Sequence, residues 1–254
     1  MSVAHPDRLL TPDEGAPAEC LNDSGTGGVV LVCEHASAFV PAALDGLGVA
    51  ERDRLSHAAW DPGALDVARA MSRELDAPLV ASRVSRLVFD CNRPPEAPDA
   101  MPARSEVIDV PGNRELTDAD RAERTRAVHD PFRDLLSQTL KARPGAALVT
   151  VHSFTPVWHG QPREAEIGFL HDADPTLANA MLEGAADLPA RAALNVPYAA
   201  ADGVTHTLRA HGAGRPNVMI EIRNDLIATP RQAEEVGRAL ARLCVRALAQ
   251  GATA

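Results

Sequence analysis

Short apolar runs alternate with longer stretches of helical periodicity along this chain of 254 residues. The runs that predict buried strands cover residues 28–33, 79–81, 86–89, 146–151, 166–170 and 217–222. Apolar residues recur at helical spacing over residues 50–75, 116–141, 174–187 and 230–249. Strands that alternate with helices are typical of an α/β fold with a mostly parallel sheet. The sequence therefore predicts one domain over residues 28–254, preceded by an N-terminal arm, residues 1–27.

Composition and charge exclude several classes of partner. The formal net charge is −10, so we expect neither nucleic acid nor an anionic membrane as the main partner, since both require a basic surface. No apolar run approaches the roughly 20 residues of a membrane helix, and the first residues show no signal-peptide pattern. The four cysteines form no CxxC pair. These features predict a cytoplasmic protein with reduced thiols.

Two histidines stand in matched positions at the ends of predicted strands. His35 follows Val-Leu-Val-Cys-Glu, and His152 follows Leu-Val-Thr-Val. Parallel strands of one sheet bring such ends together, and a neutral imidazole is a good zinc ligand. A third, carboxylate ligand is expected from Asp61 or Glu34, between which the sequence does not decide. Asp61 precedes Pro62, a pair that also marks the start of a helix.

Glu221 lies within the apolar run Val218-Met219-Ile220-Glu221-Ile222. A carboxylate in such a strand is costly unless it is paired or functional. Burial would raise the pKa of Glu221 toward the value that suits a general base. The structural alternative is a buried pair of Glu221 with an arginine.

The segment Arg86-Leu87-Val88-Phe89-Asp90-Cys91-Asn92-Arg93-Pro94 predicts a strand that ends in three polar side chains. An arginine fork binds a carboxylate through two hydrogen bonds, and an amide adds direction. The alternative is a structural Asp–Arg pair that holds a loop. Residues 94–116 are rich in proline and predict a long loop beside this site. The remaining candidates are histidines that are each more typical of a surface or loop: His57, His159, His171, His206 and His211.

Taken together, these segments resemble the N-formylglutamate amidohydrolase family from about Val29 to Asp225. The motifs that carry the resemblance are Cys-Glu-His-Ala-Ser at 33–37, His-Ala-Ala-Trp-Asp-Pro-Gly-Ala at 57–64, the segment 85–94, Val-His-Ser-Phe at 151–154, Asp-Gly-Val-Thr at 202–205 and the segment 218–226. The family is similar to zinc carboxypeptidases and the aspartoacylase group. The resemblance implies a three-layer αβα sandwich around a mixed, mostly parallel sheet.

The resemblance also implies roles for individual residues. Asp90, Asn92 and Arg93 would bind the substrate carboxylate, Glu221 would be the general base, and His35 and His152 would bind the metal. The wider group has a His-x-x-Glu motif, whereas His35 is followed by Ala36-Ser37-Ala38. The third ligand must therefore come from elsewhere, or metal binding is weak or absent.

The resulting hypothesis is a hydrolase with one Zn²⁺ per chain that cleaves an N-acyl amino acid, with N-formyl-L-glutamate as the named substrate. The assigned metal ligands are His35, His152 and Asp61, and Glu221 is the base. Substrate binding is assigned to Arg86, Asp90, Asn92, Arg93 and Arg223. The alternatives are a deacylase or peptidase of other specificity, or a metal-free binding protein. We expect a monomer or a small homo-oligomer.

Overall fold

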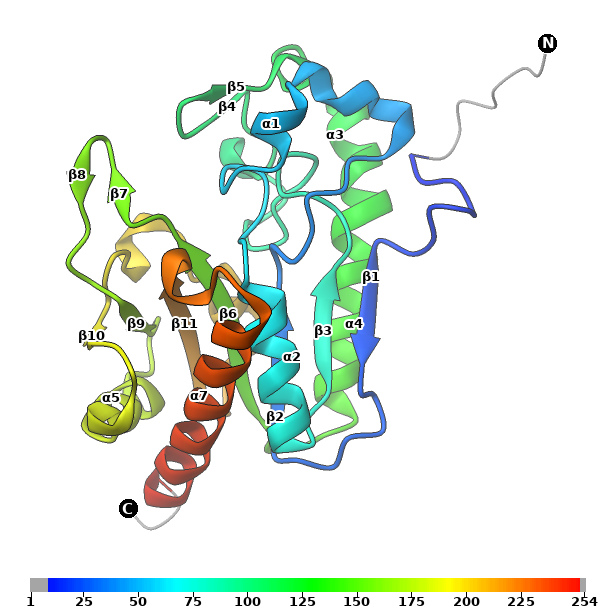
Figure 1. Cartoon of the computed structure of the whole chain (residues 1–254). Helices are drawn as coiled ribbons and strands as arrows, with labels where there is room; N and C mark the ends of the chain where they lie inside the picture. Colours follow the sequence, from blue (N-terminus) through cyan, green and yellow to red (C-terminus); the bar gives the residue numbers. More distant parts are fainter. Residues whose placement is uncertain (1–8, 252–254) are drawn as a thin grey trace.

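A seven-stranded sheet runs through the middle of the computed structural model, which describes residues 9–251 (Figure 1). The strand order is β1-β3-β2-β6-β11-β9-β10. Neighbouring strands β3, β2, β6 and β11 are parallel, β1 is antiparallel to β3, and β9 and β10 run antiparallel to β11. The strands are β1 (Ala18–Leu21), β2 (Val29–Cys33), β3 (Leu79–Ser82), β6 (Ala147–Phe154), β9 (Ile167–Leu170), β10 (Ala192–Leu194) and β11 (Asn217–Arg223).

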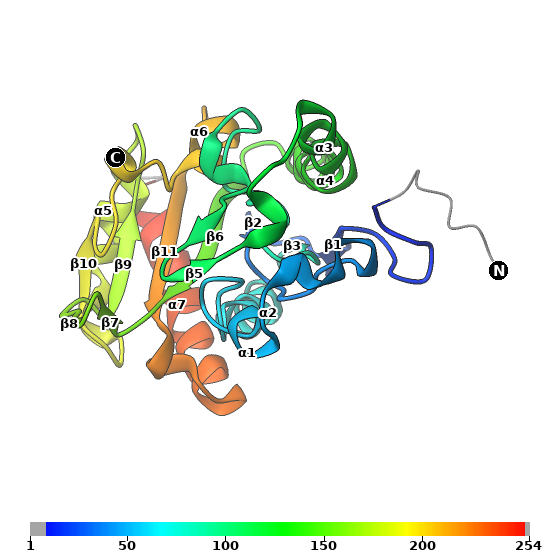
Figure 2. The ribbon, with the colours of Figure 1, turned by 90° about the horizontal axis from the view of Figure 1, so that it is seen from above.

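Helices cover the two faces of the sheet, which confirms the expected three-layer α/β arrangement (Figure 2). One face carries α2 (Ala64–Leu75), α5 (Thr176–Glu183) and α7 (Pro230–Gly251). The other carries α3 (Asp118–Arg124) and α4 (Asp130–Lys141), joined by a π-helical turn, together with α6 (His206–His211). The short elements are α1 (Glu51–Arg54), the hairpin of β4 (Arg104–Ser105) and β5 (Ile108–Asp109), and the hairpin of β7 (Val157–Trp158) and β8 (Gln161–Pro162).

The sheet separates two apolar cores because successive side chains of a strand point to opposite faces. In β2, Val29 and Leu31 face α2 and α7, whereas Val30 and Val32 face α4. The same alternation in β6 and β11 places Thr150, His152 and Glu221 on the α4 side. Among the described residues, no helix is both long enough and apolar enough to cross a membrane.

Three sequence expectations about local structure were wrong. Residues 86–89 form a turn and not a strand: the Val88 N–H donates to the Ser85 carbonyl at 2.9 Å, and Leu87 and Phe89 are buried against the core under α4. An apolar run of this length is equally compatible with a buried turn, so periodicity alone misassigned it. The segment 1–27, expected as an arm, contains β1, which pairs with β3; residues 1–8 lie outside the described residues.

The third concerns the helix start at Asp61-Pro62. Helix α2 begins at Ala64, after Gly63, and the Asp61 side chain turns away from it toward His35 and His152.

Helices α2 and α7 approach each other closely at Gly237. A Cβ atom on Gly237 would lie 2.6 Å from the Ala70 Cβ and 2.8 Å from the Val67 carbonyl oxygen. We predict that Gly237→Val lowers the free energy of unfolding by about 1–3 kcal/mol, because the larger side chain forces the two helices apart. Urea denaturation measures this loss.

The matched control is Gly28→Ala, since a Cβ at this exposed residue would meet nothing within 4 Å. Its effect should stay within about 0.5 kcal/mol. Equal stability of Gly237→Val and wild type would contradict the packing described here.

Candidate active site

The carboxyl ends of β2, β6 and β11 meet at one edge of the sheet and carry the polar residues of the site. Glu34 and His35 directly follow β2, and His152 lies near the end of β6. Glu221 in β11 is the register partner of His152. Ligand sites of α/β folds form at this edge, where several loops converge. The matched strand-end positions of His35 and His152 therefore become neighbouring positions in space.

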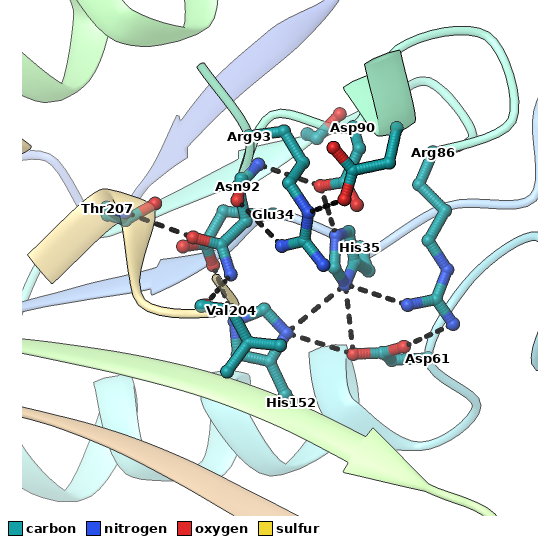
Figure 3. Close-up of polar contacts among 12 residues, drawn as sticks. Glu34, His35, Asp61, Arg86, Asp90, Asn92, Arg93, His152, Val204 and Thr207 are labelled. Atoms are coloured by element: carbon teal, nitrogen blue, oxygen red, sulfur yellow. Dashed lines mark hydrogen bonds and ion pairs between the residues drawn. The ribbon is translucent and has the colours of Figure 1, made fainter. Parts of the chain in front are cut away.

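Three electron-pair donors converge at the centre of this edge (Figure 3). The Asp61 Oδ2 lies 3.0 Å from the His152 Nδ1 and 3.3 Å from the His35 Nδ1, and the two Nδ1 atoms are 3.2 Å apart. All three side chains are buried. Of the two carboxylates that the sequence left open, Asp61 is the one that joins the histidines.

A carboxylate stands behind each histidine. The His35 Nε2 donates to the Asp90 Oδ1 at 2.7 Å, and the His152 Nε2 faces the Glu34 Oε2 at 3.1 Å. The bond to Asp90 places a proton on the His35 Nε2, and the charge of Glu34 favours a proton on the His152 Nε2 without forming a hydrogen bond to it. A neutral histidine with its proton on Nε2 presents the lone pair of its Nδ1 to the other donors. Glu34 thus lies behind His152 and outside the triangle of donors.

The cluster strongly favours a positive charge at its centre. Burial opposes charging of His152, but Glu34 and Asp61 outweigh it and raise its pKa well above the usual value. Burial likewise opposes ionisation of Asp61, but Arg86 and His35 hold its pKa well below the usual value. A buried anion with two imidazole lone pairs is a binding site for a proton or a metal cation.

The second oxygen of Asp61 faces cationic and polar groups. Its Oδ1 lies 3.0 Å from the Arg86 Nη2 and 3.5 Å from the His57 Nε2. The Ser153 N–H donates to Oδ2 at 3.2 Å. Asp61 is therefore fixed from several sides, which holds Oδ2 in place against the histidines.

Glu221 borders the same cluster without a partner of its own. Its Oε2 is buried and has no hydrogen bond to any residue that the structure describes. Burial raises the pKa of Glu221 to about 7, although nearby His152 acts in the opposite direction. The buried Glu–Arg pair considered from the sequence does not form among the described ion pairs. Glu221 is thus a buried carboxyl group that can exchange a proton near neutral pH.

A cavity of about 240 Å³ opens over these residues. The loop 94–116 forms part of its wall, since the Glu106 Oε1 contacts the His57 Nδ1 at 2.6 Å and the Ser105 hydroxyl donates to the Ala58 carbonyl at 3.0 Å. The cavity is lined by His35, His57, Asp61, Arg86, Leu87, Asp90, Asn92, Arg93, Asp99, Pro102, Arg104, Ser105, Glu106, His152, Ser153, Trp158, Tyr198, Val204 and Glu221.

This chain matches the N-formylglutamate amidohydrolase family over residues 27–228, most of its length. It belongs to that family. Membership makes it a hydrolase of amide bonds. No curated protein sequence matches the chain.

Two solved structures are similar to this member of the family. The gene product Atu2144 from Agrobacterium tumefaciens is 49% identical, with a TM-score of 0.93, over 96% of this chain and 99% of that one. The N-formylglutamate amidohydrolase from Ralstonia eutropha JMP134 is 18% identical, with a TM-score of 0.69, over 91% of this chain and 99% of that one. At that identity the second comparison shows a shared fold.

The residues predicted to bind the substrate differ in whether they line the cavity and in which partners already engage them. Arg86 and Arg93 line the cavity, and each side chain is 17% exposed. Asp90 also lines it, but its carboxylate accepts from the His35 Nε2 and from the Asn92 N–H. Arg223 lies outside the lining and is engaged by Asp225 at 2.8 Å and Glu166 at 3.5 Å. Its role in substrate binding stays a prediction without geometric support.

Asn92 is committed to the backbone of the segment before α6. Its amide nitrogen donates to the Val204 carbonyl, and its Oδ1 accepts from the Thr207 N–H at 3.0 Å (Figure 3). The side chain is buried. The Asn92 amide thus holds one wall of the cavity, and its contact with substrate stays a prediction.

The local sequence pattern gives little indication of three residues that line this site. His57 was placed among the surface candidates, and Glu106 and Tyr198 were not singled out. His57 was findable because it lies four residues before Asp61 within a family motif. Glu106 and Tyr198 come from loops far along the chain and carry no local pattern.

The arrangement of Asn92 predicts a loss of stability in its variants. Asn92→Ala would leave the Val204 carbonyl and the buried Thr207 N–H without their partner, which costs about 1–3 kcal/mol for each unsatisfied group. Chemical denaturation should show this loss. The control is Asn179→Ala on the exposed side of α5, which should change stability by less than about 0.5 kcal/mol. Wild-type stability of Asn92→Ala would refute the structural role.

Proposed function

We propose that this chain hydrolyses N-formyl-L-glutamate to formate and glutamate with one bound zinc ion. The observation that carries the proposal is the convergence of the His35 Nδ1, the His152 Nδ1 and the Asp61 Oδ2 beside the unpartnered carboxyl of Glu221. Family membership indicates that the bond cleaved is an amide, and the name of the family indicates that the substrate is formylated.

The donor set fits zinc. A tetrahedral zinc ion with ligand bonds of about 2.0–2.1 Å separates its ligand atoms by roughly 3.3–3.4 Å. The three donors are 3.0–3.3 Å apart. Two imidazoles and one carboxylate form the protein ligands of a catalytic zinc site, and a carboxylate behind each histidine fixes its orientation. Arg86 lies 3.3 Å from the His35 Nδ1, so a metal ion would replace this contact while Arg86 keeps Asp61 Oδ1.

Zinc held by His35, His152 and Asp61 would polarise the formyl carbonyl and acidify water at the site. Glu221 lies beside these ligands and accepts the proton from the attacking water. The same carboxyl group then returns the proton to the departing amine of glutamate. A base with a pKa near neutrality suits both transfers, because it neither holds nor loses the proton too firmly.

Arg93 is the proposed partner for a substrate carboxylate. Its Nε donates to Asp99 at 2.7 Å and its Nη1 to the Asn92 carbonyl at 3.0 Å. These bonds fix the guanidinium in the cavity wall and do not use its Nη2. A fixed arginine binds a carboxylate at lower entropic cost than a mobile one.

Metal binding is the first prediction of this proposal. Isothermal titration of chelator-treated protein with Zn²⁺ should give about one site per chain, and zinc at 100 times its Kd should stabilise the fold by about 2.7 kcal/mol. His152→Ala should weaken binding at least about 100-fold, because one of three ligands is lost. The control His171→Ala changes a histidine that contacts Asp172 and Asn195 and should bind like wild type. Absence of zinc binding in wild-type protein would refute the zinc assignment.

The second prediction concerns the base. Glu221→Gln should lower kcat on N-formylglutamate by about 100- to 10,000-fold, the range contributed by a general base. Zinc stoichiometry and Tm should stay near wild type, since the amide has nearly the same shape and replaces a carboxyl with an unpartnered oxygen. Glu235→Gln, on the exposed face of α7, serves as the control. Near-normal turnover by Glu221→Gln would exclude it as the base.

A further inference from the structure

The hairpin of β7 and β8 (Figure 1) leads into an arginine that lines a cavity beside the catalytic one. Arg163 follows β8, and its N–H donates to the Pro156 carbonyl at 2.8 Å, which closes the hairpin. Among the described ion pairs, none includes Arg163, and its charge acts on Glu106 only at longer range, where it contributes to the lowered pKa of that carboxyl. By contrast, Arg86 pairs with Asp61 and Arg93 with Asp99.

Neutral groups hold the Arg163 guanidinium in place. Its central carbon lies 4.9 Å from the centre of the Trp158 ring, 5.0 Å from that of Tyr198 and 5.3 Å from that of Phe154. Its Nη2 donates to the Tyr198 hydroxyl at 3.0 Å, and its Nη1 to the Thr155 carbonyl at 3.4 Å. Aromatic faces fix the position of a cation but leave its charge available to an anion.

Arg163 borders a second cavity that adjoins the catalytic one. This outer cavity has a volume of about 710 Å³ and shares Arg93, Trp158, Tyr198 and Val204 with the catalytic cavity. The shared residues form a common wall, so a ligand that extends past them from Glu221 and the histidines arrives at Arg163. His159, Gln161, Pro162, Pro197 and Asp202 complete the outer lining.

Close packing places Tyr198 between the two cavities. Gly168 is the register partner of Glu221, and a Cβ atom on it would lie 1.8 Å from the Val196 carbonyl oxygen. The segment that carries Tyr198 therefore packs directly on the sheet beside Glu221. The Tyr198 hydroxyl accepts from Arg163 and keeps its own proton free to donate.

We propose that Arg163, together with the Tyr198 hydroxyl, binds the side-chain carboxylate of the substrate and selects acidic N-acyl amino acids. This inference rests on the proposed function and deepens it. Glutamate carries two carboxylates separated by three carbon atoms. Arg93 at the shared wall is placed for the carboxylate next to the amide, and Arg163 beyond the wall for the distal one.

The test compares two substrates of nearly equal shape, N-formyl-L-glutamate and N-formyl-L-glutamine. Wild-type enzyme should favour the acidic substrate by at least about 100-fold in kcat/KM, because the neutral amide leaves Arg163 without its partner. Arg163→Met keeps an unbranched stem among the rings and removes the charge. It should lose at least about 100-fold on formylglutamate and less than about threefold on formylglutamine.

Further variants separate recognition from support of the fold. Arg163→Lys keeps the charge without the fork and should recover part of the preference, whereas Tyr198→Phe should lower it less than Arg163→Met does. Arg246→Met on α7 is the matched control and should retain both activities. An equal loss on both substrates in Arg163→Met would overturn the proposal and assign Arg163 to the structure of the hairpin.

Failure of the proposed function gives a different result. Wild-type enzyme that hydrolyses both substrates equally well contradicts selection by Arg163 but leaves the amidohydrolase assignment intact. Zinc-loaded wild-type enzyme that hydrolyses neither contradicts the proposed function. Titration with L-glutamate and L-glutamine then tests the subsite on its own: weaker binding of glutamate in Arg163→Met supports it, and unchanged binding refutes it.

Discussion

The buried contact of Asp61 with His35 and His152 is the interaction on which the carboxyl edge of this sheet depends. A buried carboxylate beside two imidazole lone pairs is costly without a cation, so the surrounding residues must compensate for it. Arg86 does so from one side of Asp61, and Asp90 and Glu34 orient the two histidines from behind. The centre of the site remains a place for a proton or a metal ion.

Charged and polar side chains around this centre hold the neighbouring loops in place. The loop 94–116 is tied down through Glu106 on His57, and the segment before α6 is held by Asn92. Because these contacts also form the cavity wall, the groups that stabilise the fold and the groups proposed to act on substrate adjoin one another. Arg163 differs from them, since aromatic rings and neutral oxygens hold it and it lines the outer cavity without an ion pair among the described residues.

Local pattern in the sequence was sufficient for the frame of the molecule. Apolar runs separated by helical periodicity predicted the α/β sheet, and β2, β3, β6, β9 and β11 lie where these runs are. His35, His152 and Glu221 were identified because a polar residue at or near the end of a buried strand is conspicuous. Parallel strands then bring such residues together without further information.

Tertiary structure alone decided the rest, because its contacts join residues far apart in the chain. Only the fold distinguishes Asp61 from Glu34, because the loop before α2 directs the Asp61 side chain toward the histidines. Residues 86–89 became a turn because packing under α4 buries an apolar segment without sheet pairing. Asn92 forms hydrogen bonds to the backbone of Val204 and Thr207, and Arg163 donates a hydrogen bond to Tyr198. The sequence determined which chemical groups lie at the edge of the sheet, and long-range packing determined which of them contact one another.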